Sequence, residues 1–235
     1  MSKREEAGLI AYEILGREHV EEATNLQIES SFQECLTIGF GIADIPGGTD
    51  HDGFASLLGS ILDDGLSLGA FDTSSGQLVG VCFNKLHTKA ERDSAAPLEE
   101  NVEENMKHPA TLDLMRFIFK LESSVDVFEH YGVTTALEVF YIGVDSRYRR
   151  YGVGRSLMRS SLELARKLAV ERRLPPPEIA YAVFTSNYSQ ALAEQFGFEW
   201  LHSLRYDQQR CYDGKLMSER IGPLHQTAVL AGRRL

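Results

Sequence analysis

Apolar and polar positions alternate along the chain in blocks that predict strands separated by helices. Short apolar runs bounded by turn residues are typical of strands, and apolar positions repeated every three or four residues are typical of helices. The pattern predicts a mixed sheet of about seven strands with helices on both faces, an α/β (α+β) fold. The expected strands are 9–15, 66–71, 78–84, 136–144, 178–184, 199–206 and 224–230, and the expected helices are 17–30, about 52–64, 111–130, one after residue 152, and 188–196.

Two segments show no such pattern. Residues 32–51 contain four glycines and predict a long loop, and residues 85–109 are highly charged and predict a partly ordered insertion. No stretch between the predicted elements is a clear linker, so we expect residues 1–235 to form a single domain.

The most informative block runs from residue 136 to residue 174, where a nine-residue apolar strand leads through a turn rich in arginine and glycine into an amphipathic helix. The first N–H groups of a helix have no partners inside the helix, and the helix dipole attracts anions to that end. Gly152 and Gly154 let the backbone approach a ligand closely. The block therefore predicts a phosphate-binding turn.

The spacing excludes two common phosphate sites. A P-loop needs a lysine after its second glycine, and neither glycine here is followed by lysine. A dinucleotide fingerprint that begins at Gly152 needs a third glycine where this chain has Leu157. The pattern that remains is Arg149-x-x-Gly152-x-Gly154.

Charge favours a small anionic ligand at this turn. Residues 147–173 contain nine basic and two acidic residues, a local net charge of +7, whereas the whole chain carries −10 and the rest of it therefore −17. A strongly acidic surface repels nucleic acid, so a multiply charged small molecule suits the basic patch better.

Composition sets further limits. The chain has the apolar and charged fractions of a water-soluble globular protein, and no apolar run reaches the length of a membrane span. Its first fifteen residues lack the apolar centre of a signal peptide. Cys35, Cys82 and Cys211 are odd in number and widely spaced, and the seven histidines show no metal-ligand spacing. We therefore expect a cytoplasmic protein that has no structural metal and no membrane or nucleic-acid partner.

The Arg149-x-x-Gly152-x-Gly154 turn between strand and helix resembles the acyl-CoA-binding signature of the GNAT superfamily of N-acetyltransferases, and the order of predicted elements resembles that family over nearly the whole chain. The resemblance implies acetyl-CoA as cosubstrate and direct acetyl transfer to an amine through a tetrahedral intermediate. It also implies a strand amide that stabilises the oxyanion. The residues implied to bind the cofactor are Ile142, Gly143, Val144, Arg149, Arg150, Tyr151, Gly152, Val153, Gly154, Arg155, Ser156 and Asn187.

Further pieces are similar to insect arylalkylamine N-acetyltransferases. Thr185, Ser186, Tyr188 and Ser189 match a Ser/Thr-Ser-x-Tyr-Ser pattern, and residues 32–36 resemble an early Phe-x-x-Glu-Pro-Leu, with Cys35 in place of the proline. Residues 108–109 give a similar histidine–proline pair. Ala193 replaces a tyrosine that serves as general acid in many GNAT enzymes, so that role is not carried over to this position.

Glu34 is the candidate general base, because an alkylamine arrives protonated and a carboxylate can remove its proton directly or through water. The acid that protonates the thiolate is left open among Ser189, Thr185, Tyr188 and water, and Ser189 could equally be a helix cap. Cys35 is expected to be a small buried thiol, since direct transfer needs no acyl-enzyme.

The acceptor pocket is predicted from aromatic and apolar residues of the loop and helix that would cover the substrate, namely Phe32, Phe40, Ile42 and Phe54, and the alternative is that the aromatic residues belong to the core. Such a pocket with a carboxylate at its edge suits an arylalkylamine such as dopamine, tyramine, octopamine or serotonin. The alternatives are agmatine or a polyamine, a protein N-terminus or lysine, or a non-catalytic role in binding acyl-CoA. We expect the chain to act as a monomer or a weak dimer.

Overall fold

A seven-stranded sheet organises the computed structural model, which describes residues 9–45, 50–92, 98–172 and 175–235. The strand order is β1-β2-β3-β4-β5-β7-β6, and every neighbouring pair is antiparallel except β4 with β5. The predicted mixed sheet is confirmed. The strands are β1 (Ile10–Ile14), β2 (Leu68–Asp72), β3 (Leu78–Thr88), β4 (Thr135–Val144), β5 (Ile179–Phe184), β6 (Glu199–Arg205) and β7 (Thr227–Arg234).

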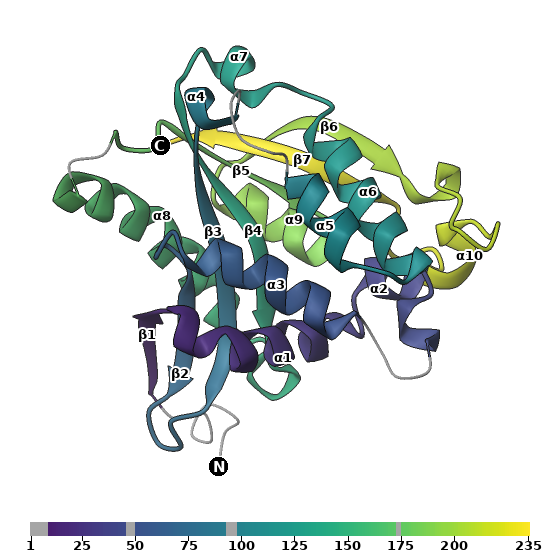
Figure 1. Ribbon diagram of the computed structural model, residues 1–235, viewed down its shortest axis with the longest axis horizontal. Coiled ribbons are helices and arrows are strands. Elements are labelled where there is room, and N and C mark those ends of the chain that lie inside the picture. The colour runs from purple at the N-terminus through teal and green to yellow at the C-terminus, as the bar shows by residue number, and fades with distance from the viewer. Residues whose placement is uncertain (1–8, 46–49, 93–97, 173–174) are drawn as a thin grey trace.

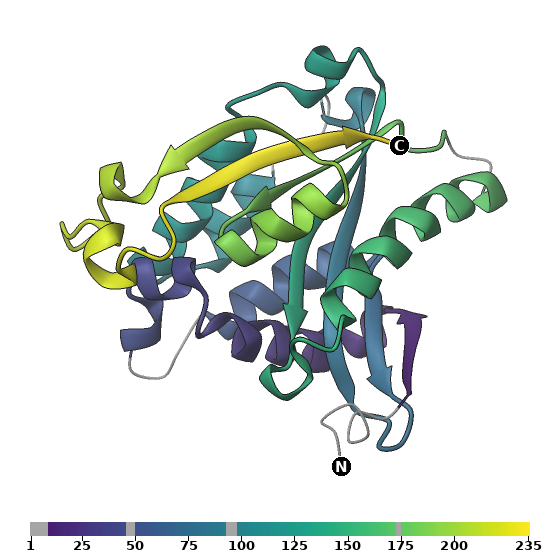
Figure 2. The same cartoon turned by 180° about the vertical axis from the view of Figure 1, so that it is seen from behind.

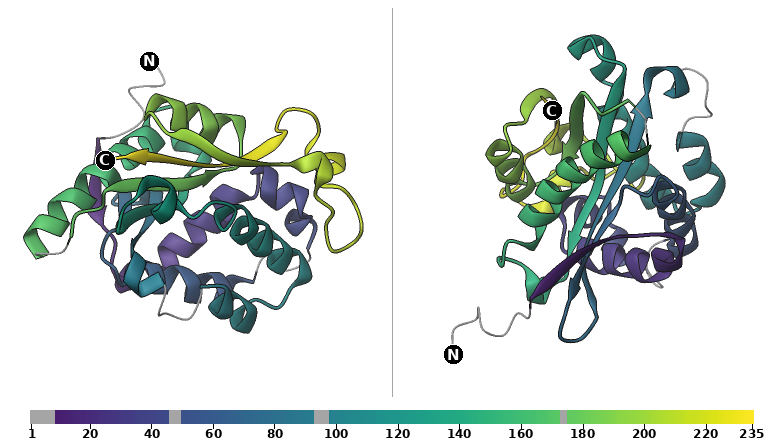
Figure 3. Two further views of the ribbon diagram at one scale, coloured as in Figure 1. Left: turned by 90° about the horizontal axis from the view of Figure 1, so that it is seen from above. Right: turned by 90° about the vertical axis from the view of Figure 1, so that its left-hand side faces the viewer.

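Helices cover both faces of the sheet, as the sequence predicts. One face carries α1, α3, α5 and α6 (Figure 1), the other carries α8 and α9 (Figure 2), and the sheet lies between the two layers (Figure 3). Each face has its own apolar core, so removal of apolar surface from water holds both layers to the sheet. The helices are α1 (Val20–Ser31), α2 (Cys35–Gly39), α3 (His51–Leu62), α4 (Lys89–Arg92), α5 (Leu98–Asn105), α6 (Pro109–Glu122), α7 (Val127–Tyr131), α8 (Val153–Arg172), α9 (Asn187–Gln195) and α10 (Met217–Ile221).

The parallel pair at the centre of the sheet separates early. β4 pairs with β5 only from Ala136 to Glu138, although β4 continues for six more residues. Two residues later the register of β4 against β3 shifts, because Phe83 lies opposite Tyr141 and Asn84 lies opposite Val139. Phe140 is therefore the extra residue of a β-bulge, which bends a strand and ends its regular pairing. The outer part of β4 is free to diverge from β5.

The segment 32–51 differs from the predicted long loop. It contains α2 and a short 3₁₀ helix, η2 (Ile42–Asp44). Leu36, Phe40 and Ile42 are all buried. The helical turns place the apolar side chains of this segment in the core. The sequence predicted a loop because glycines are typical of turns.

The helix predicted over 111–130 is two helices, α6 and α7. The Asp126 side chain accepts the backbone N–H groups of Phe128 and Glu129, so it caps a new helix after a short break. The charged insertion is also more regular than predicted, since β3 extends to Thr88 and α4 and α5 follow.

The C-terminal region departs from the prediction in two places. The last strand begins at Thr227 rather than at residue 224, and the short helix α10 was not predicted. Within the described residues, no helix has both the length and the apolar character needed to cross a membrane.

Close packing of α1 on β4 generates a testable prediction. A Cβ atom on Gly143 would lie 2.5 Å from Ser30 Oγ and 2.6 Å from Gln27 Oε1, so these two buried side chains of α1 would have to shift. We expect Gly143→Ala to destabilise the fold by about 1–3 kcal/mol. Gly154→Ala is the matched control, because the nearest atom to its added Cβ is 3.7 Å away. Urea unfolding would measure both, and equal midpoints for the two variants would contradict the prediction.

Candidate active site

A cavity of about 1600 Å³ occupies the fork where β4 and β5 diverge. It is lined from both faces of the sheet, and it brings together segments from both halves of the chain. The lining comes from β1, α1, the turn that holds Glu34, α2, η2, α3, α6, β4, the turn after β4, the start of α8, β5, α9 and residues 224–225. This position makes it the main candidate for a catalytic site.

The turn between β4 and α8 has the form expected for anion binding. Arg150 and Gly152 both adopt positive φ, at 69° and 86°, and α8 begins at Val153. The Ser156 N–H bonds to the Gly152 carbonyl oxygen at 2.9 Å, so the N–H groups of residues 153–155 precede the first hydrogen bond of the helix. A Cβ atom on Gly152 would meet no atom within 4 Å. Glycine is therefore favoured here by the positive φ angle, and the space around it is open to a ligand.

The signature residues occupy this turn as predicted. Residues 149–155 all line the cavity, and Ser156 does not. Arg150 and Arg155 are exposed, and the Arg155 guanidinium donates to Gln195 Oε1 at 2.5 Å. These two side chains and the free N–H groups fit a diphosphate, which needs several donors and positive charge at close range.

Arg149 is engaged differently from its neighbours. Its guanidinium donates to the Val144 carbonyl at 3.1 Å and to the Ser30 carbonyl at 2.7 Å, and it lies 3.8 Å from the Glu34 carboxylate. It therefore ties the end of β4 to α1 and to Glu34. The predicted role of Arg149 as a cofactor ligand stays a prediction.

The backbone of β4 presents alternate residues to the cavity. The Asp145 N–H bonds to the Val79 carbonyl, and the antiparallel register then places Gly143 and Tyr141 in the hydrogen-bonded positions facing β3. Ile142 and Val144 consequently turn their N–H and C=O groups toward the fork. Of the three predicted strand residues, Gly143 has a packing role against α1, and Ile142 and Val144 have the orientation that a ligand needs.

Glu34 lies at the edge of the cavity, immediately before α2. Partial burial raises the pKa of its carboxyl above the ordinary value, while the nearby charges of Arg149 and His225 act in the opposite direction. A raised pKa brings a carboxylate closer to the range useful for a general base.

Cys35 and Tyr206 fix the segment that carries Glu34. The Cys35 thiol donates to the Thr185 carbonyl at 2.8 Å, and the Tyr206 hydroxyl donates to the same oxygen at 2.5 Å. Cys35 is buried, and burial raises the pKa of its thiol to about 11. A protonated, buried thiol is a structural group and not a nucleophile, in agreement with the interpretation from sequence.

The start of α9 uses the predicted hydroxyl residues in a capping box. Ser186 is the N-cap, its hydroxyl accepts the Ser189 N–H at 3.2 Å, and the Ser189 hydroxyl oxygen accepts the Ser186 N–H at 3.0 Å. Thr185, Tyr188 and Ser189 all line the cavity. Ser189 therefore takes part in the helix cap and also lines the cavity.

His225 was not singled out from the sequence. Its Nδ1 accepts the Asn187 N–H at 3.2 Å, its ring meets the Tyr188 ring edge-on, and it lines the cavity close enough to Glu34 to affect the carboxyl pKa. Asn187 holds this segment further through a 2.7 Å bond from its side chain to the Leu224 carbonyl. The segment lies 190 residues after Glu34, and no local motif marks it.

The predicted acceptor residues separate. Ile42 and Phe54 line the cavity, whereas Phe40 is completely buried and packs against Phe117, and Phe32 is partly exposed outside the lining. Other residues replace them, chiefly from α6 and from the bulge of β4. We use the name acceptor branch for the part of the lining that comes from α1, α2, η2, α3, α6 and the bulge of β4, which consists of Ile28, Leu36, Thr37, Ile42, Phe54, Leu114, Ile118, Glu122, Phe140 and Tyr141.

Comparison with known proteins identifies the domain type. Residues 121–198, from the end of α6 through α9, match the model of the acetyltransferase (GNAT) family. No curated protein matches the chain by sequence. The fold agrees with this match, because a seven-stranded mixed sheet with helices on both faces is the GNAT fold.

Solved structures share the fold at low sequence identity. Arylalkylamine N-acetyltransferase 2 from Aedes aegypti superposes with a TM-score of 0.75 at 18% identity, and the match covers 96% of this chain and 98% of that one. A mosquito arylalkylamine N-acetyltransferase-like 5b gives 0.74 at 20% identity over 97% and 100%. A Drosophila melanogaster polyamine N-acetyltransferase that forms N-acetylagmatine gives 0.74 at 18% over 97% and 100%.

Proposed function

We propose that this chain is an acetyl-CoA-dependent N-acetyltransferase that acts on the primary amine of a small molecule, with arylalkylamines as the first substrate class to test. The observation that carries the proposal is the single cavity at the fork of β4 and β5. It joins a diphosphate-type helix N-terminus to a carboxylate of raised pKa and to a largely apolar branch.

Acetyl-CoA supplies the acetyl group as an activated thioester. The N–H groups at the start of α8, with Arg150 and Arg155, would bind its diphosphate. The N–H and C=O groups of Ile142 and the N–H of Val144 would hydrogen-bond the chain that leads to the thioester, as one strand pairs with the next, while the Val144 carbonyl accepts from Arg149. A fixed N–H donor at the thioester oxygen can lower the barrier by roughly 3 kcal/mol.

The Glu34 carboxylate would take the proton that makes the amine nucleophilic. Its position beside the fork would bring it close to the thioester of bound acetyl-CoA, and the bonds of Cys35 and Tyr206 to the Thr185 carbonyl attach its segment to the end of β5. The side chains that could return a proton to the thiolate are Ser189, Thr185 and Tyr188, and water is the fourth candidate. An alkanethiol has a pKa near 8.5, so its anion leaves readily even without a dedicated acid.

Aromatic and aliphatic walls support the arylalkylamine class. Phe54, Phe140 and Tyr141 would contact an aromatic ring, and Ile118 and Leu114 an alkyl chain. A second class is linear amines with another cation, as in agmatine or a polyamine, because the polyamine N-acetyltransferase that forms N-acetylagmatine shares this fold.

The direct test is turnover of acetyl-CoA with a panel of amines and peptides. Release of free CoA thiol with small amines, and not with peptides, is the expected result. Turnover of peptides alone would indicate a protein acetyltransferase, and acetyl-CoA binding without any turnover would indicate an acyl-CoA-binding protein.

The phosphate-binding turn gives the first prediction of this section. Gly152→Asp and Gly154→Asp place bulk and negative charge at the proposed diphosphate site, and calorimetry should then detect no CoA binding. Gly132→Asp is the matched control, because Gly132 also has positive φ and open space but lies outside the cavity. Unchanged CoA affinity in both cavity variants would refute the assignment.

The proposed base gives the second prediction. Glu34→Ala should lower kcat/KM for amines by about ten- to a thousandfold, with little change in CoA affinity. Because only the carboxylate form accepts a proton, the activity that depends on Glu34 should fall as pH drops through its raised pKa. The defect should shrink toward high pH, where the amine is already neutral. Glu29→Ala, at an exposed site on α1, is the control, and a pH-independent defect in Glu34→Ala would indicate positioning only.

The capping box gives the third prediction. Ser186→Ala and Ser189→Ala should each destabilise the protein by about 1 kcal/mol, because each removes part of the cap. If Ser189 also passes a proton to the thiolate, kcat should fall further in Ser189→Ala than in Ser186→Ala, with acetyl-CoA Kd unchanged. Equal kcat values in the two variants would contradict a proton-transfer role for Ser189 and would indicate that it only caps the helix.

A further inference from the structure

One buried amide oxygen in the cavity wall has no hydrogen-bond partner. Four buried side-chain atoms in the described part of the chain make no hydrogen bond, and of these only Gln27 Oε1 belongs to a residue that lines the cavity. Gln27 lies in α1 and is 8% exposed. Buried acceptors normally have a donor, because an unpaired one loses its hydration without compensation. An exception at a cavity wall points to a ligand.

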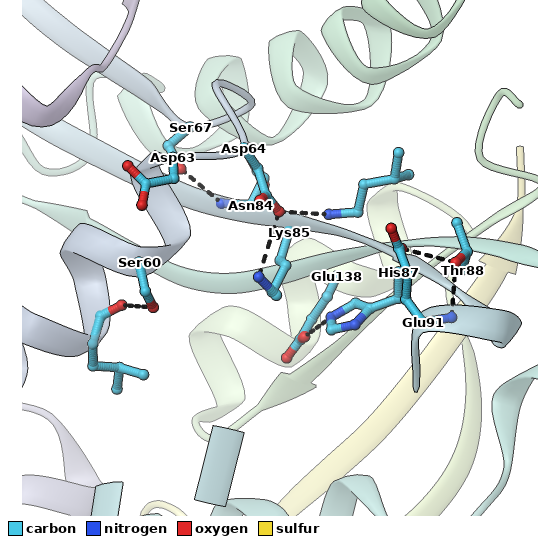
Figure 4. Close-up of polar contacts among 12 residues, drawn as sticks. Ser60, Asp63, Asp64, Ser67, Asn84, Lys85, His87, Thr88, Glu91 and Glu138 are labelled. Atoms are coloured by element: carbon cyan, nitrogen blue, oxygen red, sulfur yellow. Dashed lines mark hydrogen bonds and ion pairs between the residues drawn. The ribbon is translucent and has the colours of Figure 1, made fainter. Parts of the chain in front are cut away.

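Buried polar side chains of the sheet show the usual pattern (Figure 4). Ser67 and Glu138 are both buried. Ser67 Oγ accepts the Asn84 N–H at 3.1 Å, and the Glu138 carboxylate is bonded to His87 at 2.6 Å. These groups find their partners within the protein, away from the cavity. Gln27 departs from this pattern at a place where the wall faces the cavity.

Gln27 shares a wall of the cavity with the proposed base. Gln27 and Ser31 are four residues apart on α1, and both line the cavity, so they lie on the same side of the helix. The Glu34 N–H donates to the Ser31 carbonyl at 2.8 Å, and Glu34 therefore follows directly from this side. From Gln27 to Ser31 the helix rises only about 6 Å. Two side chains as long as those of Gln27 and Glu34 can therefore reach one small ligand.

A continuous set of contacts also connects the two side chains. A Cβ atom on Gly143 would lie 2.6 Å from Gln27 Oε1 and 2.5 Å from Ser30 Oγ, so both oxygens lie against the same point of β4. The Ser30 carbonyl accepts the Arg149 guanidinium at 2.7 Å, and that guanidinium lies 3.8 Å from the Glu34 carboxylate. Gln27 Oε1 therefore belongs to the polar end of the cavity, where the reacting amine would lie.

We propose that Gln27 is a substrate-binding residue, whose Oε1 accepts one N–H of the reacting amine while Glu34 accepts another. This inference rests on the proposed function and adds a second acceptor to it. A primary ammonium group has three N–H donors, which one carboxylate does not satisfy, and hydrogen bonds from a charged donor are strong. Oε1 lies against Gly143, and the terminal torsion of glutamine is broad, so rotation of the amide turns the oxygen toward the ligand.

Gln27→Met tests the inference through two effects of opposite sign. Methionine has nearly the shape of glutamine and no amide. Because the change removes an unpaired buried oxygen, Tm should rise by about 2–4 °C. The KM for the amine should rise by about 10- to 100-fold, with the Kd of CoA unchanged. Tyramine and 1,5-diaminopentane should lose the same factor, because the proposed bond is to the reacting amine that both contain.

Thr24→Val is the matched control. Thr24 Oγ1 is also buried on α1 without a partner, about one turn before Gln27, but Thr24 does not line the cavity. This change should raise Tm in the same way and leave the amine KM unaltered.

Gln27→Glu tests the acceptor oxygen itself. Glutamate keeps an oxygen at the same place, so the amine KM should stay near the wild-type value. A KM increase as large as that in Gln27→Met would overturn the inference.

The remaining outcomes separate this inference from the function on which it rests. A fall in Tm for Gln27→Met would show that the amide has a partner within the protein, and would overturn the inference. An unchanged amine KM in that variant would overturn it equally, whether or not CoA affinity falls. Absence of turnover of any amine by the wild-type protein would instead count against the proposed function itself.

Discussion

The early separation of β4 from β5 is the constraint on which the rest of the site depends. The parallel pairing ends at Glu138, and the bulge at Phe140 turns the outer part of β4 away from its neighbour. Unpaired strand edges inside a protein need other hydrogen-bond partners, because buried N–H and C=O groups without partners are costly. At this fork those groups face a cavity, so a ligand that continues the strand pairing would satisfy them. The same bulge places Phe140 and Tyr141 in the lining of the acceptor branch.

The segment that runs from the end of α1 into α2 is hydrogen-bonded to both sides of the fork. On one side Arg149 joins the end of β4 to the end of α1, and on the other Cys35 and Tyr206 both bind the Thr185 carbonyl where β5 ends. Glu34 lies between these two attachments, and Cys35, which makes the second one, is the next residue in the sequence. The geometry of the carboxylate is therefore set by contacts with segments about 115 to 170 residues away in the chain.

Local features were the predictable ones. The strand–turn–helix block depends on neighbouring residues and was predicted, and Ser189 was correctly expected to take part in a cap, although the N-cap itself is Ser186. Phe40 was misplaced because its aromatic side chain suits a core or a pocket equally, and only the path of α2 decides between them. His225 and Gln27 were missed for a related reason, since each reaches the cavity through tertiary packing and belongs to no motif.

The central claim is that one cavity binds the cofactor and the amine together, on the two sides of the fork. A conjugate that joins the sulfur of CoA to tyramine through an acetyl linker tests this claim most directly in steady-state inhibition. If the claim is correct, the conjugate competes with acetyl-CoA and with the amine, and it binds more tightly than CoA alone. Competition with acetyl-CoA only, at an affinity no better than that of CoA, would contradict it.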